Sequence, residues 1–171
     1  MNKLVKLIHE IGTLKNIPRS GWLKIGIKNP ESVAEHSFRT AIIAFFITYF
    51  ETKDVEKACK SSFLALIHDL PECRTLDLHN LAKKYVEVNS DVLHEQLDFI
   101  SDALDEIRDE ETENFVKDAD KLELLFQAKE YSEFTESALL YAKNLDFKSE
   151  TAKKVAGMCR KLDHRWWIDF E

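Results

Sequence analysis

The sequence predicts an all-α protein: one domain over residues 1–171, built as a compact helical bundle. Three observations favour this fold class. Apolar residues recur at the three- and four-residue spacing of a buried helix face through most of the chain. Glycine and proline number only 4 and 3 in 171 residues, which fits helices joined by short connections. Helix-capping residues precede several of the apolar segments.

The first helix is expected over about residues 2–15, because apolar residues form one stripe there: Leu4, Leu7, Ile8, Ile11 and Leu14. A turn containing Pro18 and Gly21 follows, and it carries Arg19 and Trp22. A guanidinium fork matches phosphate oxygens and an indole offers a stacking face, so both residues are candidates for ligand contact. The alternative is a solvent-exposed Arg19 and a Trp22 that fills the core.

The second helix is expected to begin at Ser32 with a capping box. The Ser32 hydroxyl would accept from the Glu35 amide, and the Glu35 carboxylate would accept from the Ser32 amide. This start fixes His36 in the first turn. Residues 38–50 are apolar almost all round, which is typical of a helix at the centre of a bundle.

The third helix, capped by Thr52 or Asp54, is expected to end with His68 and Asp69. An imidazole and a carboxylate at the end of an apolar helix are costly to bury unless they are paired or hold a metal ion. Glu72 follows Asp69 by three residues and His68 by four, so we expect it on the same side as both.

The rest of the chain is predicted as a loop over 74–80, a short helix over 81–88, and longer helices over 92–108 and from 109–112 onward. Two further helices, over about 133–143 and 149–164, precede an aromatic tail. His9 and His94 fall beside the apolar stripes, and we expect them at the surface.

Two carboxylates compete for one role in the helix that begins at 109–112. Asp120 lies beside its apolar face. Asp118 lies about 200° round the helix from Asp120, so we expect Asp118 to face solvent.

Two imidazoles and two carboxylates thus fall on three different helices: His36, His68, Asp69 and Asp120. This donor set suits Zn²⁺, Mn²⁺, Co²⁺, Ni²⁺ or Fe²⁺ better than Ca²⁺ or Mg²⁺, which prefer oxygen. Such an ion polarises a phosphoryl oxygen and lowers the pKa of a bound water. The competing interpretation is a set of buried histidines with a structural role.

Three further residues suit a reaction at that ion. Glu72 is the candidate proton donor or shuttle. Asp77 is a second candidate for acid–base work or for contact with a sugar. Arg19 would hold the phosphate oxygens and offset charge in the transition state.

The order His, His-Asp, Asp resembles the HD-domain metal-dependent phosphohydrolases, and within them the 5′-deoxynucleotidases. The likeness runs through four stretches in order: residues 17–22, 30–37, 68–72 and 115–120. It implies an all-α HD-domain bundle, usually dimeric or larger. It also implies hydrolysis of 2′-deoxyribonucleoside 5′-monophosphates to deoxyribonucleoside and phosphate with a divalent transition-metal ion.

The resemblance assigns roles to the same residues. It implies that Arg19 contacts the phosphate and Trp22 lies near the substrate, and that Glu72 and Asp77 act in catalysis or recognition. It implies four metal ligands: His36, His68, Asp69 and Asp120. The sequence departs from the family in the loop around Asp77. There the family usually has Gly-Asp and a proline-containing turn, whereas this chain has Leu-Asp-Leu-His-Asn at residues 76–80. This departure leaves the sugar and base preference open. His79 is either a replacement recognition contact or an ordinary loop residue.

Composition limits the partners. A formal net charge of −7 argues against polymeric nucleic acid or an anionic membrane, but not against a small nucleotide. No apolar run is long enough for a signal peptide or a membrane span. The 3 cysteines fit reduced thiols in a cytoplasmic protein. Two other functions stay open: hydrolysis of another nucleotide or phosphate ester, and a non-catalytic module that binds metal or nucleotide.

Overall fold

The protein is all-α, which confirms the predicted fold class. The computed structural model describes residues 1–89 and 91–170. No strand forms within those residues, and Pro18 and Ser32 pair only as an isolated antiparallel bridge. No helix in this part of the chain has the length and apolar character needed to span a bilayer.

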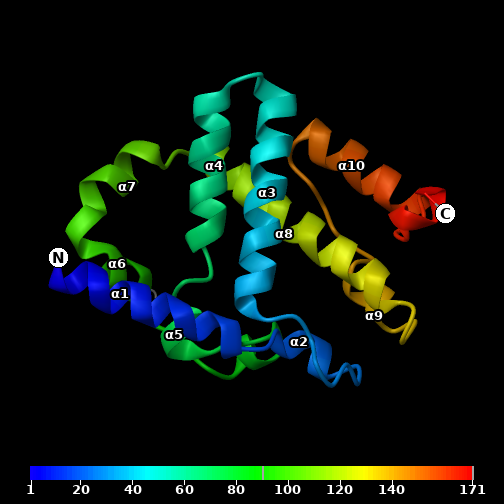
Figure 1. Ribbon diagram of the computed structural model, residues 1–171, viewed down its shortest axis with the longest axis horizontal. Helices are drawn as coiled ribbons and strands as arrows, with labels where there is room; N and C mark the ends of the chain where they lie inside the picture. The colour runs from blue at the N-terminus through cyan, green and yellow to red at the C-terminus, as the bar shows by residue number, and fades with distance from the viewer. Residues whose placement is uncertain (90, 171) are drawn as a thin grey trace.

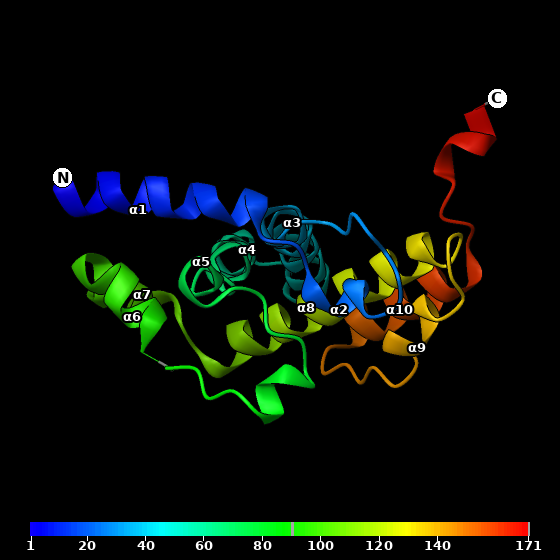
Figure 2. The ribbon, with the colours of Figure 1, turned by 90° about the horizontal axis from the view of Figure 1, so that it is seen from below.

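Three helices form the centre of the fold. Figure 1 shows α3 (Val33–Thr52) and α4 (Val55–Ile67) upright and side by side, with α8 (Glu110–Tyr131) crossing behind them. Figure 2, seen from below, places α1 (Asn2–Gly12) on the opposite side of α3 and α4 from α8. The bundle therefore has α3 and α4 as its middle layer.

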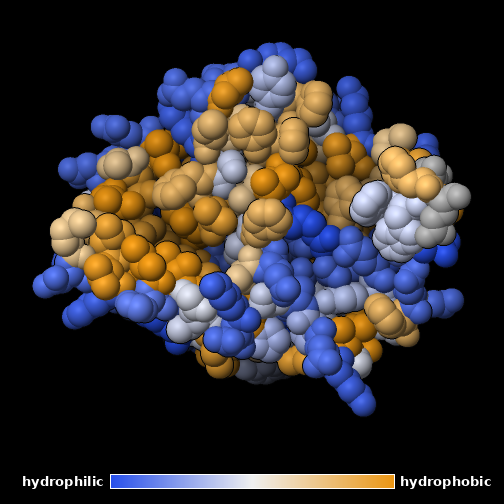
Figure 3. Space-filling model, viewed as in Figure 1, coloured by the Kyte–Doolittle hydropathy of each residue, from blue (hydrophilic) through white to orange (hydrophobic). Residues whose placement is uncertain are grey.

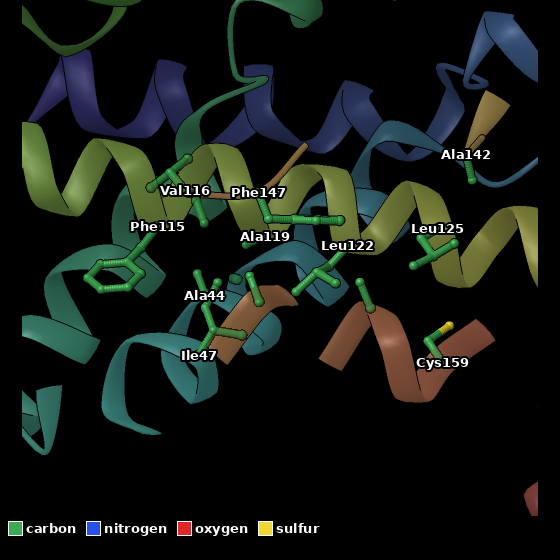
Figure 4. Packing of buried hydrophobic residues seen from close by; sticks show 14 of the residues in the cluster. Ala44, Ile47, Phe115, Val116, Ala119, Leu122, Leu125, Ala142, Phe147 and Cys159 are labelled. Carbon is green, nitrogen blue, oxygen red and sulfur yellow. The ribbon is translucent and has the colours of Figure 1, made fainter. Parts of the chain in front are cut away.

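The main core lies along α8. Figure 4 shows its apolar side chains reaching toward α3 and toward α10 (Glu150–Lys161), with Phe147 inserted beside them. The buried α8 residues in this core are Phe115, Val116, Ala119, Leu122, Leu125 and Ala128. A second cluster, formed with α1, includes Leu7 and Leu14 and joins the start of α3 to the end of α4.

Capping fixes where the central helices begin. The predicted capping box is confirmed: the Ser32 hydroxyl accepts from the Glu35 amide at 3.2 Å, and the Glu35 carboxylate accepts from the Ser32 amide at 2.7 Å. Asp54 caps α4 by accepting from the Lys57 amide at 3.0 Å. Of the two predicted caps, Asp54 is the one used, because Thr52 is the last residue of α3.

Several outer helices are shorter than predicted. The first ends at Gly12 and continues as a 3₁₀ turn, Thr13–Asn16, where the Thr13 hydroxyl donates to the Glu10 carbonyl at 2.7 Å. Only Ala82–Lys84 of the expected 81–88 helix is helical, as a 3₁₀ turn. The final helix, α10, ends at Lys161 rather than near residue 164.

Two predicted helices also differ in continuity. Residues 92–108 form α6 (Val92–Leu97), a 3₁₀ turn and α7 (Ser101–Ile107), and the 133–143 region forms only α9 (Ala138–Tyr141). Leu97 and Leu104 both reach the second cluster. Two short helices therefore bury the same apolar residues that one continuous helix would bury. Ser and Thr residues before α9 favour turns over helix.

One apolar face of α3 stays uncovered. The helix is central, as predicted, but a stripe at four-residue spacing is exposed: Phe38, Ile42, Phe46 and Phe50. Exposed apolar residues of α1 include Val5 and Ile8. Figure 3 shows apolar surface gathered over this side of the molecule. The aromatic tail forms a 3₁₀ turn, Trp166–Phe170, in which Trp166 and Phe170 are also exposed.

Candidate metal centre

Four side chains from α3, α8 and the end of α4 meet where these elements converge. His36 lies in the first turn of α3 and is completely buried. His68 and Asp69 follow the last residue of α4, and Asp120 projects from the middle of α8. We call His36, His68, Asp69 and Asp120 the candidate ligand cluster.

The distances within this cluster suit one ion. Nε2 of His36 lies 3.2 Å from Oδ1 of Asp120 and 3.5 Å from Oδ2 of Asp69. Nε2 of His68 lies 3.3 Å from Oδ2 of Asp69 and 3.9 Å from Oδ1 of Asp120. Tetrahedral ligands with bonds of 2.0–2.2 Å stand about 3.4 Å apart. Donor atoms of His36, His68 and Asp69 all lie within 4.8 Å of one another, which is nearly the spacing of a transition-metal shell. Asp120 falls outside that group but lies close to both imidazoles.

The hydrogen bonds of His68 point its free nitrogen at this shell. Nδ1 of His68 lies 2.6 Å from the Ala65 carbonyl oxygen, to which it donates. Nε2 is buried, and no group within residues 1–89 and 91–170 forms a hydrogen bond with it. A ring that donates through Nδ1 presents a lone pair at Nε2, as a metal-binding histidine does. The residues present therefore fit a divalent transition-metal ion.

The charges of the cluster also favour a cation. Burial lowers the pKa of His36, but its hydrogen bonds to Asp120 and Glu123 outweigh this and raise that pKa to about 10. Burial opposes ionisation of Asp120, yet the nearby His36 and His68 imidazoles hold its pKa below its usual range. Because opposite charges raise imidazole pKa values in this way, the site attracts positive charge.

Arg19 lies against the cluster. Its Nη1 is 3.0 Å from Oδ2 of Asp69 and 3.8 Å from Oδ1 of Asp77. The Arg19 amide donates to the Glu31 carbonyl at 2.9 Å, which ties this turn to the start of α3. The predicted phosphate-binding residue thus stands beside the candidate ligands.

Asp77 is held by a hydrogen bond from the Ser20 amide and follows a residue with an unusual backbone conformation. Its Oδ2 accepts from the Ser20 amide at 2.5 Å. The preceding residue, Leu76, has a φ of 61°, a conformation that L-residues rarely adopt. Strain of this kind persists where the surrounding structure fixes it, and it occurs often at functional sites.

Glu72 is buried in the first turn of α5 (Glu72–Thr75). Its Oε2 has no hydrogen-bond partner in the described part of the chain. Burial, together with the nearby charges of Asp69 and Asp77, raises the pKa of Glu72 to about 8. The carboxyl group is therefore suited to carry a proton at neutral pH.

A cavity of about 470 Å³ opens onto these groups. Arg19, Asp69, Glu72, Asp77 and Asp120 line it. Lysine side chains of residues 24, 83 and 84 line it as well. A larger hollow of about 670 Å³ lies elsewhere, beside Glu31 and Arg39, but it contacts none of the candidate ligands. The smaller cavity is therefore the candidate substrate site, because it contacts the candidate ligands.

Trp22 belongs both to the hydrophobic core and to the wall of the cavity. It lines the cavity, but only 2 % of its surface is exposed. Its Nε1 donates to Glu31 at 3.0 Å, and its ring packs against Tyr131 and Tyr141. The structure thus gives Trp22 a core role and a place in the cavity wall.

The comparisons with known proteins agree with this geometry. A family model described as an HD domain matches residues 11–163. This chain belongs to the HD-domain family. The 5′-deoxynucleotidase HDDC2 of Danio rerio is 32% identical over 152 residues, covering 78% of the chain and 72% of that relative. The resemblance to HD-domain 5′-deoxynucleotidases in the sequence is confirmed.

Solved structures share the HD-domain fold. A structural-genomics crystal structure is 46% identical, with a TM-score of 0.90, and the match covers 98% of this chain and 99% of that one. The cyanophage S-2L HD phosphohydrolase DatZ, bound to dA and one catalytic Zn²⁺ ion, is 19% identical with a TM-score of 0.56. That match covers 90% of this HD-domain chain and 94% of DatZ, and it bears on the fold alone.

The sequence-based interpretation of this HD-domain protein had one clear error near the site. Asp118 is fully buried rather than solvated. Its carboxylate accepts from the Lys148 amide at 2.9 Å and from the Ser149 amide at 2.7 Å, before α10 begins. Asp118 does lie on the other side of α8 from Asp120, as the helix geometry predicted. That side is covered, however, by the segment leading into α10. His9 and His94 are exposed, as predicted.

Sequence reasoning also missed residues beside the site. Glu123 accepts from His36, and Arg39 pairs with Glu123. The spacing offered one indication of the first contact: Glu123 follows Asp120 by three residues on a helix, so both point to one side. The position of Arg39 depends on how α3 packs against α8, which spacing does not give.

Proposed function

We propose that this HD-domain hydrolase cleaves 2′-deoxyribonucleoside 5′-monophosphates to a deoxyribonucleoside and phosphate. The observation that carries the proposal is the convergence of the candidate ligand cluster beside a cavity that also exposes Arg19 and Glu72. Membership of the family, and the 5′-deoxynucleotidase activity named for its relatives, support the choice of substrate.

The candidate ligand cluster would hold a divalent ion: Mn²⁺, Co²⁺, Ni²⁺, Fe²⁺ or Zn²⁺. Such an ion supplies Lewis-acid activation of a phosphoryl oxygen and of a water. DatZ, which shares the fold, is described as holding one catalytic Zn²⁺ ion, and this agrees with the choice of a transition metal.

Two side chains of the protein would bind the phosphate and donate the proton. Arg19 would donate to the non-bridging phosphate oxygens, because a guanidinium matches phosphate geometry. Its Nη1 lies 3.0 Å from Asp69, and this places it beside the ion that would bind the same phosphate. Water attacks phosphorus as the bond between phosphorus and the 5′ oxygen breaks. Glu72 would give its proton to the leaving 5′ oxygen and so complete the nucleoside hydroxyl.

Asp77 and Trp22 would position the substrate. Asp77 uses one oxygen to hold the Ser20 amide, and its other oxygen lies 3.8 Å from Arg19. That second oxygen could orient Arg19 and accept from a sugar hydroxyl. Trp22 would form part of the wall against which the nucleoside rests.

A second candidate substrate class is a nucleotide or phosphate ester with more negative charge. Three lysines line the cavity, at residues 24, 83 and 84, and positive charge of this kind would attract an ester with more than one phosphate. A panel of substrates separates the classes. A non-catalytic binding module is the remaining alternative, and the buried, unpaired Glu72 oxygen argues against it.

The decisive test uses purified protein loaded separately with each metal. We expect faster phosphate release from deoxynucleoside monophosphates than from ribonucleotides or phosphosugars. Preferred cleavage of triphosphates or cyclic nucleotides would favour the second class. A lack of turnover with every ester and every metal would contradict the enzyme assignment.

We also propose that the protein is cytoplasmic and forms a homodimer or larger homo-oligomer. Free thiols at Cys59, Cys73 and Cys159 support a reducing compartment. The exposed apolar face of α3 supports self-association. Sedimentation over a range of concentrations tests assembly, and a monomer throughout would contradict it.

A further inference from the structure

We infer that Glu123, held by Arg39, is a positioning residue for the metal site: it fixes the His36 ring so that Nε2 faces the ion. This inference rests on the metal site of the proposed function. It concerns two residues, Glu123 and Arg39, that lie outside the candidate ligand cluster.

The two nitrogens of His36 face different groups. Nδ1 lies 2.7 Å from Oε2 of Glu123, whereas Nε2 lies 3.2 Å from Asp120 and 3.5 Å from Asp69. Both His36 and Glu123 are almost completely buried, at 0% and 1% exposed. A carboxylate that accepts from Nδ1–H leaves the lone pair of the neutral ring at Nε2. Only this tautomer can bind an ion held by Asp69 and Asp120.

Arg39 fixes the carboxylate in turn. Its Nε and Nη2 donate to Oε1 of Glu123 at 2.9 and 2.7 Å. The same guanidinium donates to Glu130 at 2.7 and 2.9 Å and to Gln127 at 2.5 Å. Glu123 therefore has one oxygen for Arg39 and the other for His36, and a rotation of its carboxylate would break both contacts.

A second metal ion is the competing interpretation, because Glu31, His36 and Glu123 also bring donor atoms within 4.8 Å of one another. The contacts favour positioning instead. The Glu31 carboxylate accepts from the Trp22 indole at 3.0 Å, and Glu123 is engaged by a guanidinium. A permanent positive charge beside Glu123 repels a cation.

The test compares Glu123→Gln with Glu130→Gln. Both substitutions remove a carboxylate from the same guanidinium, but only Glu123→Gln removes the one that contacts His36. We expect Glu123→Gln to weaken Zn²⁺ affinity by roughly 10- to 100-fold, as for other outer carboxylates of metal-bound histidines. Glu130→Gln should bind as the unsubstituted protein does. Affinity is measured by competition with a chelator, without any substrate. Equal affinity for both variants would overturn the inference.

A spectroscopic measurement does not depend on the variant folding. In the unsubstituted Zn²⁺-loaded protein, nitrogen-15 NMR should show a proton on Nδ1 of His36 and the metal on Nε2. An unprotonated or metal-bound Nδ1 would overturn the inference. If the unsubstituted protein binds no metal at all, the proposed function fails first, so the two failures are distinguishable.

Discussion

Nη1 of Arg19 lies 3.0 Å from Oδ2 of Asp69, the same oxygen that lies 3.3 Å from Nε2 of His68 and 3.5 Å from Nε2 of His36. One carboxylate oxygen therefore links the proposed phosphate-binding group to both imidazoles. A phosphate bound between Arg19 and the ion would be held from two sides. Asp69 thus contacts both a group placed for phosphate and two candidate metal ligands.

Asp69→Ala should remove both metal and activity. The substitution deletes a ligand and the nearest anionic partner of Arg19, so the remaining cluster has too few donors and too little negative charge. Metal analysis after dialysis should find the variant depleted, and its activity should match that of chelator-treated unsubstituted protein. Full metal stoichiometry in the variant would refute the assignment of Asp69 as a ligand.

Glu72→Gln should separate chemistry from metal binding. The side chain keeps its size and its place in the cavity but loses its transferable proton. We expect unchanged metal content and a loss of kcat of roughly 10²- to 10⁴-fold, the usual worth of a general acid. Loss of metal instead would mean that Glu72 is a ligand. A substrate with a good leaving group, such as a nitrophenyl phosphate, should be affected less.

The lysines of the cavity rim should act through long-range attraction. Lys83→Ala combined with Lys84→Ala removes two positive charges from the cavity lining. We expect a higher KM at low salt, a smaller effect at high salt because screening already weakens the attraction, and a nearly unchanged kcat. Lys117→Ala, an exposed residue of α8, provides the control. A fall in kcat alone would assign the lysines to chemistry.

The candidate ligand cluster could be predicted from the sequence because its members stand at helix ends or beside helical stripes. The capping box at Ser32 placed His36, and the end of α4 placed His68 and Asp69. The contacts of Glu123 and Arg39 could not be predicted in the same way. They depend on the distance and rotation between α3 and α8, and these follow from packing of the whole core.

Stability should depend on pH through Glu10. Hydrogen bonds from Arg74, and a weaker one from Gln96, outweigh burial and lower the pKa of Glu10 below its ordinary value of 4.5. Since the folded pKa lies below the unfolded one, this stabilisation is present above about pH 4.5 and is lost as pH falls through the folded pKa. Nearby charged and titratable groups are Arg74, Glu95 and Cys73.

The measurement compares urea unfolding of the unsubstituted protein and Glu10→Gln. The unsubstituted protein should be more stable at pH 7 by less than about 1 kcal/mol, because the pair is partly exposed. The difference should shrink below pH 4.5. A difference that grows on acidification would contradict the sign of this linkage.

The outer helices show where sequence patterns stop being sufficient. A stripe such as Leu93, Leu97, Ile100 and Leu104 predicts which side chains are buried, and Leu97 and Leu104 are buried. It does not distinguish one helix from two helices joined by a 3₁₀ turn, because both bring these residues to one cluster. Asp118 shows the same limit for a polar residue: its place on α8 was correct, but its partners come from a distant segment.

Asp118→Ala should destabilise the fold without altering the site. The buried Asp118 carboxylate is the acceptor for the Lys148 and Ser149 amides, and its removal leaves both part-buried donors without that acceptor. We expect a loss of roughly 2–4 kcal/mol in the free energy of unfolding, whereas Asp118→Asn, which keeps one acceptor oxygen, should lose less. Lys117→Ala, on the exposed side of the same helix, should change stability by at most about 0.5 kcal/mol. Metal content measured well below the melting temperature should be unchanged, because Asp120 and not Asp118 faces the histidines. Loss of metal with unchanged stability would reverse the roles of these two carboxylates.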